Sequence, residues 1–365
     1  MILNLFAGPG GLDMGARILN ITTPTRGYDL DHDACATATA AGFHRTQASV
    51  TDLNPEHFPT TTGVLPTPPC PPFSRGGLGK GINDMPTIRH ALTLLGDNVA
   101  GMVPDHAYQE ALADLHDPRS ALLIETLRFA FRLPHVQWMV AEQVPAVAPI
   151  WQEIGAELAM TTDWTHLAVL TVAAQDLGVA SGRTRTFLIA TRHHQPDLTG
   201  LPMRSLWTTG RFAAPRHELP PTPAHFPTTT MAAALGWPAG ERVNTRGNRR
   251  TSGGNEFSAD ATAWCLTSKA RSWKRVSDGV HLTAAQAGLL TGFPADYPWQ
   301  GSRTKQFLQA ADVVSPPVAA AVLGATLGID WQQPVRDYLA SIYPANANQA
   351  PAMSQPTLFE LERTA

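Results

Sequence analysis

Cysteine, charge and long apolar runs are all scarce in this 365-residue chain. Three cysteines, Cys35, Cys70 and Cys265, are too few and too scattered for a disulfide framework or a CxxC metal site, so no metal is expected. Free thiols are typical of a reducing compartment, where one of them can be kept for chemistry. No apolar run approaches the roughly 18 residues of a membrane-spanning helix, so no membrane association is expected.

The first residues of the chain also carry no basic region and no cleavage site. They therefore predict no signal peptide. Together with the free thiols, this predicts a cytoplasmic protein of a bacterial or phage-infected cell.

Positive charge is lacking overall, since the net charge is −3, and this argues weakly against a nucleic-acid partner. The distribution is uneven, however: residues 204–275 contain 11 Lys/Arg and 4 Asp/Glu, which leaves the rest of the chain acidic. A basic segment on an acidic body suggests a local polyanion-binding face. A solvated, loop-rich surface would have the same composition, so charge alone leaves both interpretations open.

Apolar residues make up 43% of the chain, enough for a large core. Short apolar segments typical of strands lie at 2–6, 25–31, 62–69, 135–142 and 184–192. Segments with helical spacing follow or separate them, at 12–21, 32–43, 120–133, 148–160, 282–293 and 316–328. Strands that alternate with helices predict an α/β fold with a parallel, helix-covered sheet.

The texture of the sequence divides the chain into four parts. We expect a catalytic and cofactor-binding domain at 1–194. A smaller, irregular domain rich in Pro, Thr, Gly and Arg is predicted at 195–280, with Trp207, Trp237, Trp264 and Trp273 in its core. Residues 281–332 are expected to rejoin the first domain, and the Ala-, Pro-, Gln- and Asn-rich tail at 333–365 is predicted to be mobile.

The first predicted strand runs into a glycine turn, FAGPGG, whose backbone can approach a ligand closely. The second strand ends at Asp29, which can accept both hydroxyls of a ribose, with Leu30 placed to lie on an adenine face. Asp52, followed by Leu53, can accept an amino-group proton. The turn lacks the GxGxxG form and phosphate-binding cations, which favours S-adenosylmethionine over a pyrophosphate cofactor. The predicted contacts in the turn are Phe6, Gly8, Gly10 and Gly11.

Cys70 lies between two prolines in the segment TPPCPPFSRGGLGKG, residues 67–81. Pro71 biases it to an extended conformation, so the thiol is presented on a stiff segment. A free thiol titrates near ~8.5, and a useful nucleophile needs a nearby cation; Arg75 and Lys80 are close in sequence. The alternative is a small buried hydrophobe.

Seven segments, in family order, resemble the motifs of the DNA (cytosine-5)-methyltransferases. FAGPGG and PPCPPFS resemble the first motif and the catalytic Pro-Cys motif, and DPRSALLIETLRF resembles the helix after the active-site loop. AEQV resembles the Glu-Asn-Val motif, and AQDLGVASGRTRTFLIA resembles the segment with two arginines. LTAAQAGLLTGFP and ADVVSPPVAAAVLG resemble the last two motifs. The resemblance covers nearly the whole chain except 195–280.

The resemblance implies a Rossmann-like, S-adenosylmethionine-dependent methyltransferase domain with a smaller, irregular target-recognition domain. Cys70 would add to C6 of a cytosine flipped out of duplex DNA, and C5 would take the methyl group. Glu142 would bind the exocyclic amine and N3, while Arg185 would neutralise O2 and Arg183 would hold the base or a phosphate. The alternative is that Glu142 and the arginines are ordinary structural groups.

Three departures from the family pattern bear on this expectation. Gln143 replaces an Asn that braces the catalytic loop. Ala311-Asp312 replaces a Gly-Asn at the methionine end of the cofactor. Asp312 would repel the cofactor carboxylate or favour a more cationic transferable group; the simpler alternative, which we prefer, is that it points away or bonds backbone amides. Residues 82–117 form an insertion that is expected to be helical, and either touches DNA, caps the site or is neutral.

The expected partner is double-stranded DNA, and a cognate restriction endonuclease is a candidate partner. The protein is expected to be a monomer. Residues 355–359, QPTLF, resemble the peptide that docks on bacterial sliding clamps; the alternative is that Leu358 and Phe359 pack on the body. A catalytically silent DNA-binding relative and a tRNA cytosine-5 methyltransferase are the alternative functions. The predicted DNA contacts are Ser74, Arg75, Lys80, Arg246, Arg249 and Arg250.

Overall fold

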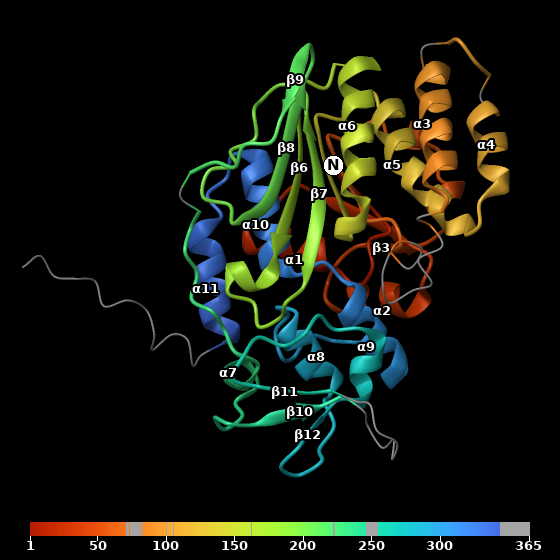
Figure 1. Cartoon of the computed structure of the whole chain (residues 1–365). Helices are drawn as coiled ribbons and strands as arrows, with labels where there is room; N and C mark the ends of the chain where they lie inside the picture. Colours follow the sequence, from red (N-terminus) through yellow and green to blue (C-terminus); the bar gives the residue numbers. More distant parts are fainter. Residues whose placement is uncertain are drawn as a thin grey trace, which may run out of the picture.

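A nine-stranded sheet, in the order β3-β2-β1-β4-β5-β7-β6-β8-β9, forms the centre of the molecule (Figure 1). Five strands are parallel and confirm the predicted α/β sheet. They are β1 (Ile2–Leu5), β2 (Thr25–Asp29), β3 (Arg45–Gln47), β4 (Gly63–Pro66) and β5 (Trp138–Gln143). The computed structural model describes residues 1–343 except 71–72, 74–80, 82, 100, 105, 162, 222 and 246–254.

The other four strands are antiparallel, which the prediction of a parallel sheet did not include. Strand β7 (Thr184–Thr191) lies between β5 and β6 (His166–Ala173), and β8 (Met203–Gly210) and β9 (Ala213–Arg216) continue the sheet. The physical reason is the short connection: only one 3-10 turn separates β6 from β7, and a parallel pair needs a crossover of about a dozen residues.

The expected domain boundary at residue 195 also needs correction, because β8 and β9 belong to the central sheet. Trp207 on β8 is buried in the core of that sheet and not in a separate small domain. The part that leaves the sheet therefore begins after Arg216. It holds the three-stranded sheet β11-β10-β12 and helix α7, and it gathers at one end of the molecule (Figure 1). These elements are α7 (Met231–Leu235), β10 (Arg242–Asn244), β11 (Glu256–Ser258) and β12 (Lys274–Arg275).

Helices cover both faces of the central sheet (Figure 1). Strand β1 shows the cause, since Ile2 packs into one hydrophobic cluster while Leu3 and Leu5 pack into the other. One face carries α1 (Gly11–Ile18), α10 (Pro316–Leu327) and α11 (Gln332–Ile342). The opposite face carries α3 (Met85–Val99), α5 (Leu122–Arg132) and α6 (Ala148–Thr161). The remaining helices are α2 (His32–Ala40), α4 (Ala107–Ala111), α8 (Ala284–Leu290) and α9 (Arg303–Asp312).

The insertion at 82–117 is helical, as predicted, and contributes α3 and α4. Asp84 joins its two ends, because the buried carboxylate accepts hydrogen bonds from the His116 and Asp117 backbone amides and from Ser120 Oγ at 2.7 Å. Helix α3 packs against α5 and α6, so this part of the insertion belongs to the core of the domain.

The predicted mobile tail begins too early in the sequence. Helix α11 occupies 332–342, and Val335 and Tyr343 are fully buried. Tyr343 Oη donates a hydrogen bond to the carbonyl oxygen of Leu289 at 2.6 Å, which ties the helix to α8. The clamp-like motif at Gln355–Phe359 lies outside the described residues.

In the described part of the chain, one helical stretch, Arg303–Leu327, is long and apolar enough to cross a membrane by length and composition. Its most apolar window is 89% buried inside the protein, as expected for a core helix.

The glycine turn after β1 is locked against the C-terminal segment. A Cβ atom on Gly11 would lie 2.1 Å from the carbonyl oxygen of Val314, so the close approach of these two backbones requires glycine. Gly10 has a φ of 112°, a left-handed conformation that side chains other than glycine rarely adopt. Tyr297 Oη donates to the Pro9 carbonyl and holds the turn from the other side.

We predict that Gly11→Ala lowers the free energy of unfolding by about 3 kcal/mol, because two backbone segments must move apart. Gly328→Ala is the control: φ is +66° but nothing lies within 4 Å of the added Cβ, so a loss of only about 1 kcal/mol is expected. Urea unfolding measures both, and equal losses would show that the contact with Val314 does not matter.

Candidate active site

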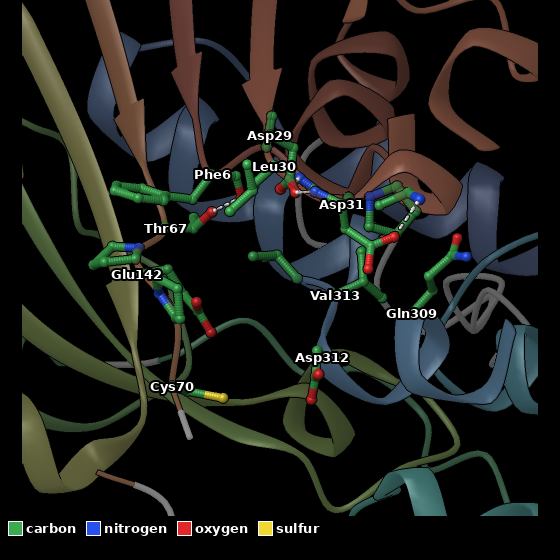
Figure 2. Close-up of a pocket in the computed structure, with 18 of the residues that line it drawn as sticks. Phe6, Asp29, Leu30, Asp31, Thr67, Cys70, Glu142, Gln309, Asp312 and Val313 are labelled. Atoms are coloured by element: carbon green, nitrogen blue, oxygen red, sulfur yellow. Dashed lines mark hydrogen bonds between the residues drawn. The ribbon is translucent and has the colours of Figure 1, made fainter. Parts of the chain in front are cut away.

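A cavity of about 300 Å³ opens at the carboxyl ends of β1, β2, β4 and β5 (Figure 2). Its size suits a small-molecule ligand. Residues from the glycine turn, the ends of these strands and the segment after α9 line it. The cavity therefore brings together segments that lie more than 300 residues apart in sequence.

The glycine turn and Asp29 form one end of the cavity. The Asp29 carboxylate accepts hydrogen bonds from the Gly8 and Asp31 backbone amides, both at 2.8 Å. Burial raises the pKa of Asp29, although these hydrogen bonds and the charge of Arg45 oppose the rise. The acid thus fixes the shape of the turn and keeps lone pairs for a ligand hydroxyl. A Cβ on Gly8 would meet nothing within 4 Å, which leaves open space for a ligand beside the turn.

Phe6 and Leu30 line the cavity and supply apolar walls (Figure 2). Leu30 is 69% exposed, an unusual position for a large aliphatic side chain unless a ligand covers it. Gly10, in contrast, does not line the cavity; its Cβ position faces Phe43 and Tyr297, so its role is to shape the turn.

Asp52 and Leu53, predicted to bind the cofactor, are not among the residues that line the cavity. Asp52 is exposed and Leu53 packs toward the core beneath α5, so neither lines the cavity. Ser49 and Val50 line it instead, at the start of a 3-10 turn that carries the next two residues away. The chain changes direction within this three-residue turn, so the position of Asp52 in the sequence does not show whether its side chain faces the cavity.

Asp31 is a cavity residue that the sequence analysis missed. Its carboxylate caps helix α2 through the Asp33 and Ala34 amides and pairs with Lys305 Nζ at 2.6 Å. The available signal was its position immediately before a helical segment, where Asp is a preferred cap. The ion pair with Lys305 joins the first part of the chain to α9.

Cys70 lies half-buried at the other end of the cavity, at the end of the segment that follows β4. Gln143 holds this segment: its Nε2 donates to the carbonyl oxygens of Pro68 at 3.0 Å and Pro69 at 3.2 Å, while its Oε1 accepts from the Val144 amide. Gln143 therefore performs the bracing role expected of Asn at this position, despite the extra methylene.

The charges around Cys70 act in opposite directions. Burial raises the pKa of the thiol to about 11, with the negative charges of Asp312 and Glu142 adding to the rise and Arg185 and Arg183 opposing it. A pKa above neutrality leaves the thiol mostly protonated. Forming the thiolate therefore needs a proton acceptor or an additional positive charge.

Glu142 and Arg185 face each other across neighbouring antiparallel strands. The end of β5 meets the start of β7, so Glu142 Oε1 lies 2.9 Å from Arg185 Nε in a buried ion pair. Beyond this ion pair, the buried oxygen has no hydrogen-bond partner among the described residues. Burial raises the pKa of Glu142, and the two arginines oppose that rise. The pair is thus positioned to receive a polar ring that carries both donors and acceptors.

Arg183 does not line the cavity, which differs from its predicted role as a direct base or phosphate contact. Its buried guanidinium donates to the carbonyl oxygens of Ala311 and Asp312, the latter at 2.8 Å. Arg183 therefore positions the segment that carries Asp312.

Asp312 lines the cavity and does not point away from it, and Figure 2 shows the Cys70 sulfur pointing toward it. Its side chain is exposed to the cavity, and no described residue forms a hydrogen bond or ion pair with its carboxylate. Desolvation raises the pKa of Asp312, and the charges of Arg183 and Arg185 oppose the rise. Bonding to backbone amides, one interpretation of this residue, is not observed.

The predicted DNA contacts lie outside the described residues. These are Ser74, Arg75, Lys80, Arg246, Arg249 and Arg250. In the described part of the chain, no group of three or more His, Cys, Asp or Glu side chains is placed to hold a metal ion.

Comparison with known proteins gives a family match for the first part of the chain. Residues 1–94 match the model of the C-5 cytosine-specific DNA methylase family. The match covers about a quarter of the chain and shows a likeness to this family in that N-terminal part. The Type II methyltransferase M.AplI of Arthrospira platensis is 32% identical over 110 residues, which is 30% of each chain, so the match spans less than a third of that relative.

Solved methyltransferase structures share the fold of this chain. An Entamoeba histolytica methyltransferase superposes with a TM-score of 0.57 at 13% identity, covering 90% of this chain and 97% of the other. Schizosaccharomyces pombe Dnmt2 gives 0.56 at 13% identity, with 90% and 98% covered. A putative DNA modification methyltransferase from an Escherichia coli prophage gives 0.52 at 17% identity, with the same coverage. The predicted Rossmann-like methyltransferase fold is thereby confirmed.

We predict that Asp312→Asn lowers the pKa of Cys70, because it removes a negative charge that disfavours the thiolate. Alkylation of Cys70 by iodoacetamide at pH 8.5, followed by peptide mass spectrometry, should become severalfold faster. Asp337→Asn on the exposed face of α11 is the matched control and should leave the rate unchanged. An unchanged or slower reaction of Asp312→Asn would contradict the assigned charge effect.

Proposed function

We propose that this protein is an S-adenosylmethionine-dependent DNA (cytosine-5)-methyltransferase. The observation that carries the proposal is the composition of the cavity. One end suits a nucleoside, with Asp29 at a strand end and Leu30 exposed as a wall. The other end holds a thiol beside a carboxylate–guanidinium pair, Cys70 with Glu142 and Arg185.

The residues present fit S-adenosylmethionine as cofactor. The space beside Gly8 is open, and the walls formed by Phe6 and Leu30 are apolar. Among the described lining residues, no cation lies at the turn to bind a phosphate. When bound, S-adenosylmethionine would supply the methyl group. Asp29 would accept hydrogen bonds from the ribose hydroxyls, and Ser49 would lie near the adenine of the cofactor.

The three groups at the other end have complementary roles toward an extruded cytosine. The Cys70 thiolate would add to C6, which places negative charge on the ring and makes C5 nucleophilic. Glu142 would hold the exocyclic amine and N3, and its raised pKa favours the protonated form that donates to N3 as this charge develops. Arg185 would stabilise negative charge at O2.

These side chains cannot reach C6 of a cytosine that is stacked and paired inside a duplex, so the base must leave the stack. The part of the chain after Arg216, which would recognise the target, supplies exposed cations for the DNA phosphates, among them Arg242 and Lys269. Sequence readout would come from the arginines at 246–250. A cognate restriction endonuclease as partner fits the Type II relative, and we propose that the protein is a cytoplasmic monomer.

Two alternatives remain distinct proposals. A tRNA cytosine-5 methyltransferase would use the same cavity with a different nucleic acid. A catalytically silent DNA-binding relative would keep the fold without the chemistry; the arrangement of Cys70, Glu142 and Arg185 weighs against it.

We predict transfer of labelled methyl to C5 of cytosine in unmodified plasmid DNA, with a loss of at least ~10³-fold in Cys70→Ala, because the nucleophile is removed. The assay compares duplex DNA with tRNA as acceptors. Transfer to tRNA alone would favour the RNA enzyme, and no transfer to either acceptor would favour the silent relative.

A further inference from the structure

We propose that Asp312 is the general base that removes the C5 proton of the target cytosine. This inference rests on the proposed function and adds a residue to it. The observation behind it is the unengaged Asp312 carboxylate, which faces the cavity beside the Cys70 sulfur (Figure 2).

The chemistry requires such a group. After Cys70 adds to C6 and C5 gains a methyl group, C5 is tetrahedral and still carries its original proton. The product forms only when a base takes that proton. The electrons of the C5–H bond then form the C5=C6 double bond, the C6–S bond breaks, and the Cys70 thiolate leaves. No oxidant, reductant or further reactant is needed.

The other acids that line the cavity are already engaged. Asp29 is held by the Gly8 and Asp31 amides, and Asp31 caps α2 and pairs with Lys305. Both lie at the nucleoside end. Glu142 is paired with Arg185 and is needed protonated at N3. Among the described lining carboxylates, only Asp312 is free of such a contact.

The position of Asp312 is fixed through its main chain and not through its side chain. Arg183 holds the Ala311 and Asp312 carbonyl oxygens, and the buried Val313 and Val314 follow. The carboxylate can therefore point into the cavity without losing a structural contact. Asn at this position, as in the family pattern, could donate or accept a hydrogen bond but could not take a proton.

The charges around Asp312 suit a base. Desolvation raises the pKa of Asp312 and strengthens it as a proton acceptor, while the charges of Arg183 and Arg185 oppose the rise and favour the ionised form. Cys70 and Glu142 are the other titratable groups that face it. Once Cys70 is bonded to C6 as a thioether, its charge no longer competes for the proton.

The experiment measures exchange of the C5 hydrogen without cofactor. Reversible addition of Cys70 to C6 lets a solvent proton enter at C5, and the base then removes one of the two. Plasmid DNA labelled with [5-³H]cytosine therefore releases tritium to water. We expect Asp312→Asn to slow this release about 100-fold, and Asp312→Glu, which keeps a carboxylate, to retain a substantial part of the rate.

Trapping on DNA that contains 5-fluorocytosine separates this step from the earlier ones. With fluorine at C5 there is no proton for a base to remove, so Cys70 cannot be eliminated. The covalent complex formed in the presence of S-adenosylmethionine therefore persists whether or not a base is present. Asp312→Asn should form it at the wild-type rate or faster, since the Cys70 pKa falls. Asp337→Asn should match the wild type in both assays.

Two outcomes would overturn the proposal: tritium release by Asp312→Asn within threefold of the wild type, or release and trapping that fall together. In the second case Asp312 would support addition and not proton removal. Failure of the wild-type protein itself to form the covalent complex would instead overturn the proposed function, so the two failures are distinguishable.

Discussion

The buried guanidinium of Arg183 holds the cavity together. It donates to two carbonyl oxygens 128 and 129 residues further along the chain, and so fixes the segment that ends α9 against the sheet. That segment supplies both Asp312 and the Val314 carbonyl that presses on Gly11. Without this tie the C-terminal wall would lose its place, because a buried guanidinium left unpaired is costly. The site therefore depends on a contact between the strand that carries Arg185 and the last part of the fold.

Electrostatics at the catalytic end are balanced between two acids and two arginines. Glu142 and Asp312 raise the pKa of the Cys70 thiol, while Arg183 and Arg185 lower it. Burial decides the outcome in favour of the protonated thiol. Under the proposed function, this arrangement would keep the Cys70 thiol protonated and unreactive until a cytosine enters the cavity. Burying these titratable groups together lowers the stability of the fold, as is typical of functional sites.

Much of the fold could be predicted from sequence, because strong apolar periodicity and glycine turns are local signals. The strands around β1 and the acid at the end of β2, Asp29, are examples. Glu142 and Arg185 are singled out only by the resemblance to a family, and they line the same cavity as Cys70. Non-local features could not be predicted: β8 joins the central sheet through pairing with β6, and the reversal after Ser49 turns Asp52 away from the cavity. The resemblance to a family suggested a direct base contact for Arg183, whereas its hydrogen bonds go to a segment far along the chain.

The central claim is that Cys70 is the nucleophile of this cavity, and a second thiol makes the claim testable. Cys265 is exposed and also lies beside Arg185. Mass spectrometry of the peptide joined to 5-fluorocytosine DNA distinguishes them directly. The account predicts a single DNA-linked peptide attached through Cys70; attachment through Cys265 would contradict it.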